Sequence, residues 1–94
     1  MSDIDDNEES FAEDTLIQAI ENQIESEQPP AARAVFNKLT LVGYEREDAL
    51  HLMALVLAHE IEAMLAADRP FDGVWYEQAL RALPQLPGEE EGAE

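Results

Sequence analysis

The chain has 94 residues, contains no cysteine and carries a formal net charge of −17 at pH 7. Its length suits one small domain, and the lack of cysteine excludes disulfides, a thiol nucleophile and thiolate metal sites. The charge argues against direct binding of nucleic acid or an anionic membrane surface. Phosphate groups are bound by Lys and Arg, and the chain has 5 of these against 22 acidic residues.

The acidic residues are concentrated towards the two ends of the chain. The first 27 residues contain ten acids and no Lys or Arg, and the last seven contain four acids, whereas the middle holds eight acids and five bases. Short acidic segments without large apolar residues cannot bury enough surface to stay ordered. We therefore predict disordered acidic tails over residues 1–9 and 85–94, on either side of a single helical domain over residues 10–84.

The first predicted helix covers residues 11–27. Ser10 and Glu13 have the spacing of a capping box, in which each side chain accepts a hydrogen bond from the backbone amide of the other residue. Four large apolar residues follow at the spacing of one helical face: Leu16, Ile17, Ile20 and Ile24.

The second predicted helix covers residues 30–42. Pro30 suits its first turn, where the missing amide hydrogen is not needed, and Gly43 can adopt the left-handed conformation that ends a helix. The residues expected to be buried share one face: Val35, Phe36, Leu39 and Val42.

The third predicted helix covers residues 46–67 and is the longest and most apolar. Its longest uninterrupted apolar run, residues 52–58, is much shorter than the about 20 residues that a membrane span needs, and the first ten residues lack the features of a signal peptide. These features predict a soluble, cytoplasmic protein. Arg69, just beyond this helix, is expected to bind the last carbonyl groups of the helix or to pair with Asp72.

The fourth predicted helix covers residues 72–83, with Asp72 as its N-cap and Tyr76 at the start of its apolar stripe. Trp75 lies one position off that stripe and is expected at the edge of the core. No segment has the alternating pattern of a strand. The predicted fold is therefore all-α, a small four-helix domain in which the long third helix is central.

Both histidines lie in the third helix, within one arc of a helical wheel that contains Asp48, His51, Leu55, His59, Glu62 and Ala66. Such an arc is typical of the solvent-facing side of a core helix. A pH-sensitive contact surface is a second interpretation, because histidine changes charge near neutral pH, and a metal or acid–base site is a third. The third is disfavoured because eight residues separate the histidines by about 12 Å along the axis. We predict no metal, no cofactor and no catalytic residue.

The apolar arc of the third helix spans more than half of its circumference, and three other helices are not expected to cover it fully. We therefore predict a small acidic protein-interaction module without enzymatic activity. Its candidate partner-binding residues are His51, Leu55, His59, Phe71 and Trp75. The expected partner is another protein with a basic surface, attracted by the acidic first helix, or a second copy of the chain bound through the third helix. The alternative is a nucleic-acid decoy that inhibits a DNA- or RNA-binding protein.

A further pattern within residues 41–72 consists of Gly43, Tyr44, Ala49, His51, Val56, Leu57, Leu65, Arg69, Pro70 and Phe71. This pattern resembles a family of short bacterial helical proteins of unknown function. It covers about a third of the chain and consists mostly of core and helix-ending residues. Glu45 stands where a serine or aspartate helix cap would be usual. The resemblance implies a bacterial origin and draws attention to His51, and it brings no activity, cofactor or binding residue with it.

Overall fold

The computed structural model describes the backbone of residues 2–87 and the side chains of residues 14–87. It contains four α-helices: α1 (Ser2–Ser26), α2 (Pro30–Leu41), α3 (Arg46–Ala67) and α4 (Gly73–Ala82). No β-strand occurs over residues 2–87. The prediction of a small all-α domain with four helices is confirmed, and α2, α3 and α4 begin and end within one residue of their predicted positions.

Helix α1 differs from the prediction at its N-terminal end. It begins at Ser2 instead of residue 11, so that the segment 2–9, which was expected to be a disordered tail, has helical backbone. This segment contains no Gly or Pro, the strongest helix breakers, and acidic residues near a helix N-terminus interact favourably with the helix dipole. Ser10 is therefore a position within α1 rather than its N-cap.

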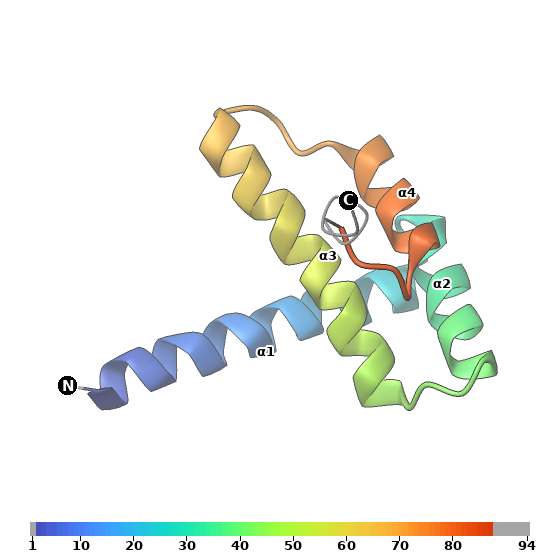
Figure 1. Ribbon diagram of the computed structural model, residues 1–94, viewed down its shortest axis with the longest axis horizontal. Helices are drawn as coiled ribbons and strands as arrows, with labels where there is room; N and C mark the ends of the chain where they lie inside the picture. Colours follow the sequence, from blue (N-terminus) through green and yellow to red (C-terminus); the bar gives the residue numbers. More distant parts are fainter. Residues whose placement is uncertain (1, 88–94) are drawn as a thin grey trace.

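The N-terminal half of α1 projects away from the other helices, whereas its C-terminal half crosses α3 and packs on α2 and α3 (Figure 1). Ile20 is completely buried in this contact. Four further apolar residues of α1 are partly buried against the same core: Leu16, Ile17, Ala19 and Ile24. The predicted apolar stripe thus attaches only the C-terminal half of the helix to the domain.

Helix α2 ends at the glycine that the sequence predicted. The Tyr44 amide donates to the Leu39 carbonyl at 3.0 Å, and the Gly43 amide donates to the Thr40 carbonyl at 3.1 Å. Gly43 has a φ of 112°, which glycine adopts without the steric penalty that other residues pay. Val42 was expected to be buried but is 65% exposed, because it follows the last helical residue.

Helix α3 lies at the centre of the domain and contacts all three other helices (Figure 1). Its buried residues are Ala49, Leu50, Met53, Ala54, Val56, Leu57 and Glu60. By length and composition alone, α3 is also a candidate membrane span. This is weak evidence for a membrane protein, because the core helix of a soluble bundle meets the same criterion, and here three helices pack on α3.

Helix α4 closes the core against α2 and α3. Tyr76 and Leu80 are buried, as is Leu83 directly after the helix. The chain then turns back between α3 and α4 in the view of Figure 1, and Leu86 packs against the core. The domain therefore continues past residue 84, where the prediction ended it. Residues 88–94, the rest of the predicted acidic tail, lie outside the described residues.

Candidate functional site

One face of α3 is exposed along the whole helix, and we call it the α3 strip. Its residues, three or four positions apart, are Asp48, His51, Leu55, His59, Glu62 and Ala66, and all six are exposed. Leu55 is the single large apolar residue of the strip, and 40% of its surface is exposed. Leu52 and Ala58, beside the strip, are half-buried. The strip coincides with the polar arc that the helical wheel predicts.

Trp75 of α4 flanks the α3 strip at His59. The two rings are stacked, with centroids 5.4 Å apart and planes inclined by 21°. Trp75 is also partly buried against the core, so it lies at the border between core and strip, as its position beside Tyr76 predicts. Four of the five candidate residues are thus brought together on one side of the domain: His51, Leu55, His59 and Trp75.

Asp72 fixes the position of Trp75. Its carboxylate accepts a hydrogen bond from the Trp75 amide at 3.0 Å, which confirms Asp72 as the N-cap of α4. The backbone amide of Asp72 in turn donates to Glu60 Oε2 of α3 at 2.7 Å. These two hydrogen bonds connect α3 to the first turn of α4 and thereby determine where Trp75 meets His59.

Glu60 is the only buried charged residue among the side chains of residues 14–87, with 1% of its surface exposed. Its carboxylate accepts two hydrogen bonds from Arg69, at 2.7 and 3.1 Å, in addition to the one from the Asp72 amide. Arg69 also donates to the Pro70 carbonyl at 2.8 Å. We call the contact of Glu60, Arg69 and Asp72 the Glu60 joint. With it in place, no buried side-chain nitrogen or oxygen in this part of the chain lacks a partner.

The Glu60 joint favours the charged forms of both side chains. Hydrogen bonding from Arg69, followed by that from the Asp72 amide, lowers the pKa of Glu60 below its usual value, although burial acts in the opposite direction. The same pairing raises the pKa of Arg69. Glu60 therefore stays ionised at neutral pH and holds the α3–α4 connection as a charge-assisted contact.

Arg69 has a structural role, as predicted, but the predicted partners are wrong, because its guanidinium pairs with Glu60. The end of α3 is satisfied by the backbone instead: the Arg69 amide donates to the Met64 carbonyl at 3.2 Å, and the preceding Asp68 has a φ of 54°. This turn leaves the Arg69 side chain free to reach back to α3. The sequence did contain a signal for the pair, since Glu60 is a single acid on the apolar side of the third helix and is followed nine residues later by an arginine.

Phe71, the fifth candidate residue, packs edge-on against Tyr76, with ring centroids 5.3 Å apart. Tyr76 is buried, and its hydroxyl donates to Gln23 Oε1 of α1 at 2.8 Å. Burial raises the pKa of Tyr76 to about 12, so its hydroxyl remains a donor at neutral pH. Phe71 is 42% exposed and packs on the ring of Tyr76, whose hydroxyl connects α4 to α1.

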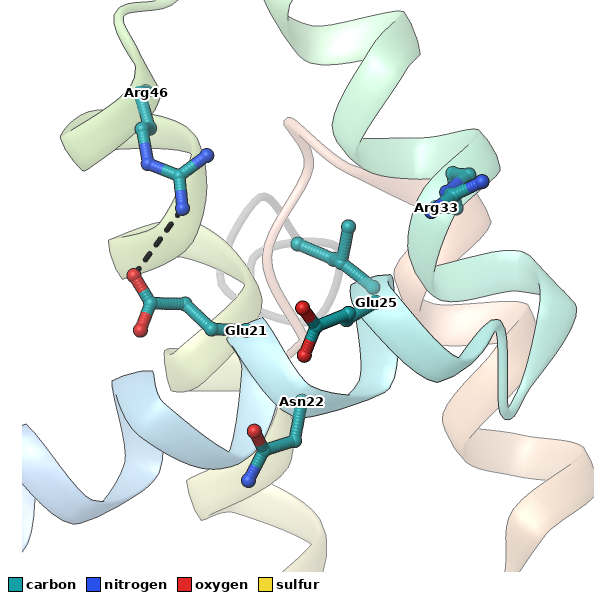
Figure 2. Close-up of a pocket in the computed structure, with 6 residues that line it drawn as sticks. Glu21, Asn22, Glu25, Arg33 and Arg46 are labelled. Carbon is teal, nitrogen blue, oxygen red and sulfur yellow. Dashed lines mark hydrogen bonds and ion pairs between the residues drawn. The ribbon is translucent and has the colours of Figure 1, made fainter.

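A polar hollow lies where α1 meets α2 and the start of α3. Figure 2 shows its lining, which consists of Glu21, Asn22, Ile24, Glu25, Arg33 and Arg46. Arg46 pairs with Glu21 at 3.3 Å, and Arg33 pairs with Glu27 at 2.9 Å. Two arginines and two glutamates balance one another in the lining, so the hollow has no excess charge with which to attract an ion. We interpret it as part of the surface contact between helices.

Within residues 14–87, no three His, Asp or Glu side chains lie close enough together to hold a metal ion. No protein-family model, no curated protein and no solved structure matches the chain. The resemblance to short bacterial helical proteins therefore stays a prediction.

Proposed function

We propose that the protein is a small interaction module that binds another protein through the α3 strip and the adjoining edge of Trp75. The observation that carries this proposal is the position of Leu55, which is 40% exposed at the middle of a helix whose other sides form the core. Interfaces are enriched in aromatic residues at their centres and often surround them with polar groups. Leu55 with Trp75, bordered by His51 and His59, has this composition.

The Glu60 joint supports the proposal because it fixes the surface in advance. Glu60 and Arg69 hold α3 and the α3–α4 connection together, and Asp72 holds the first turn of α4. A partner would therefore meet side chains that are already positioned, and less conformational entropy would be lost on binding.

The test compares two replacements of leucine by glutamate. Leu55→Glu places a charge in the α3 strip, whereas Leu41→Glu places the same charge at the end of α2, where the wild-type leucine is 86% exposed. We expect Leu55→Glu to weaken binding of the partner on the order of tenfold or more, and Leu41→Glu to leave it unchanged. Binding of the partner is measured on the purified, immobilised chain of each variant. The helix content of each variant is measured by circular dichroism. Equal binding by both variants would contradict the proposal.

A nucleic-acid decoy is the second candidate function, and the extent of α1 favours it. Nine acidic residues lie in the sequence of Ser2–Ser26, and five of them precede residue 10, in the half of the helix that projects from the bundle (Figure 1). A decoy has to present negative charges on a firm scaffold, as the phosphates of nucleic acid are presented. A helical α1 meets this requirement better than the disordered tail that we predicted.

The decoy is tested by neutralising charges while the chain length is kept. Five acids of the projecting half of α1 are changed to their amides: Asp3, Asp5, Asp6, Glu8 and Glu9. The measurement is the competition of the chain with DNA for a basic DNA-binding protein. A decoy loses its inhibition in this variant and keeps it in Leu55→Glu, whereas the opposite pattern favours the interaction module.

A further inference from the structure

We infer that the partner of the α3 strip is a second copy of this chain, with the two α3 helices packed antiparallel. This inference rests on the proposed function, because it assigns an occupant to the same surface. It comes from the order of the side chains along the exposed side of α3.

Four residues at the border of the α3 strip nearest Trp75 form a line that we call the α3 seam: Asp48, Leu52, Leu55 and His59. Their spacing of four, three and four residues is that of side chains along the contact of two packed helices. Asp48 and His59, at the ends, are exposed, Leu55 is 40% exposed, and Leu52 is half-buried. From one end to the other, the order is acid, leucine, leucine, histidine.

This order is complementary to itself when it is reversed. In an antiparallel pair with its twofold axis at the middle of the α3 seam, Asp48 of each copy meets His59 of the other, and Leu52 meets Leu55. A twofold interface repeats every contact, so four leucines lie between two acid–imidazole contacts. A parallel pair would instead place Asp48 against Asp48, and like charges in contact disfavour a complex.

The surroundings of the end residues fit such contacts. His59 is held by the stacked ring of Trp75, and Glu62 follows it one turn later on the same strip. Asp48 takes part in no ion pair within residues 14–87. Each end of the antiparallel seam would thus combine an available carboxylate with an imidazole whose ring is already positioned, and Trp75 would add apolar surface beside it.

Most of the net charge of −17 comes from residues outside α3, and Glu21 of α1, which lies near the start of the seam, is paired with Arg46. The first 27 residues hold ten acids and the last seven hold four, whereas the seam holds one acid and one histidine. At physiological salt the screening length is about 8 Å, so charges further from the contact repel one another only weakly.

The chain contains no cysteine, so single cysteines can report the geometry in the full-length protein. Leu55→Cys lies near the twofold axis and should form a disulfide with the second copy on mild oxidation.

Asp48→Cys alone, or His59→Cys alone, should not form this disulfide. Two copies of either position are about 16 Å apart along the axis, well beyond the span of a disulfide. A mixture of Asp48→Cys with His59→Cys should link on the order of tenfold faster than either alone, since these positions lie level in the antiparallel pair. Leu41→Cys gives the rate of chance collisions.

Linking of the mixture, together with a dimer mass in light scattering that Leu55→Glu converts to a monomer, supports the inference. Efficient linking of Asp48→Cys or His59→Cys alone overturns it, because those positions are adjacent only in a parallel pair. A monomer at every concentration, with all variants linking at the Leu41→Cys rate, also overturns it. In that last case the proposed function is tested separately. It holds if Leu55→Glu loses binding to a different protein and Leu41→Glu keeps it.

Discussion

His59 and Glu60 are neighbours in α3, but their surroundings are opposite. His59 is exposed and touches the ring of Trp75, whereas Glu60 has 1% of its surface exposed and accepts three hydrogen bonds. Successive residues of a helix point about 100° apart, which is enough to turn one side chain to solvent and the next into the core. A charge is tolerated on the core side because the chain itself supplies every partner it needs, whereas a polar side chain on the exposed side can be solvated by water.

The two sides of α3 should therefore respond differently to mutation. Changes to the Glu60 joint are expected to alter the free energy of unfolding, because the joint connects α3 to α4. Changes to the α3 strip are expected to alter binding with little change in stability.

Loss of Glu60 should have the largest effect. In Glu60→Ala, the Arg69 guanidinium and the Asp72 amide lose their acceptor, and a buried pair that is broken on one side is strongly destabilising. We expect the Tm to fall on the order of 10 °C in thermal denaturation followed by circular dichroism. Glu62→Ala, on the exposed strip of the same helix, is the control, and its Tm should change by no more than about 2 °C. A small change in both variants would mean that the joint does not hold the domain together.

Acid should remove the contribution of Glu60 selectively. Its pKa is lower in the folded protein than its ordinary value of 4.5, so the stabilisation is fully present above about pH 4.5. As the pH falls below that value towards the lower pKa of the folded state, the unfolded chain binds a proton before the native one does, and the stabilisation is lost. Urea unfolding of the wild type and Glu60→Gln should therefore give midpoints that differ at pH 7 and converge as the pH falls below 4.5. A constant difference would show that the charge of Glu60 is not what stabilises the joint.

The sequence predicts the helices well wherever a local signal marks their ends. Pro30, Gly43 and Asp72 each impose a backbone or capping geometry through their own chemistry, and the structure has helix ends at all three. The start of α1 was missed because Ser10 and Glu13 match a capping box, although nothing in residues 2–9 prevents the helix from starting earlier. A capping pattern is compatible with a helix start at that position, but a helix can also continue through it.

The candidate surface was predictable in its exposure but not in its contacts. The helical wheel identifies the arc of His51, Leu55 and His59 because helical periodicity is a local property. The isolated acid Glu60 and the following Arg69 indicated a possible pair, but the pairing depends on the turn at Asp68, where a non-glycine residue takes a left-handed conformation that no local signal had marked. Long-range contacts of this kind follow from the path of the chain after the helix, which periodicity does not contain.

Removal of the Tyr76 hydroxyl should have a smaller effect than either change at Glu60. Tyr76→Phe keeps the buried ring and leaves the half-buried amide oxygen of Gln23 without its donor at 2.8 Å. We expect a loss of about 1 kcal/mol in the free energy of unfolding, measured by urea denaturation. Tyr44→Phe is the matched control, because the Tyr44 hydroxyl makes no hydrogen bond among residues 14–87 and should contribute almost nothing. Equal losses in the two variants would mean that the bond to Gln23 adds nothing to the link between α4 and α1.

The smallest change in stability is expected at His59. His59→Ala removes the ring stacked on Trp75 from an exposed position, where such a contact is worth about 0.5 kcal/mol, the lower end of the range for aromatic pairs. Trp75 is the only tryptophan of the chain, so its fluorescence reports on this contact directly. The emission maximum should move to longer wavelength in His59→Ala, because water reaches the face of the indole that the imidazole covered, and it should stay unchanged in His51→Ala, two turns away on the same strip. A shift of equal size in both variants would mean that the environment of Trp75 depends on the whole α3 strip and not on its contact with His59 alone.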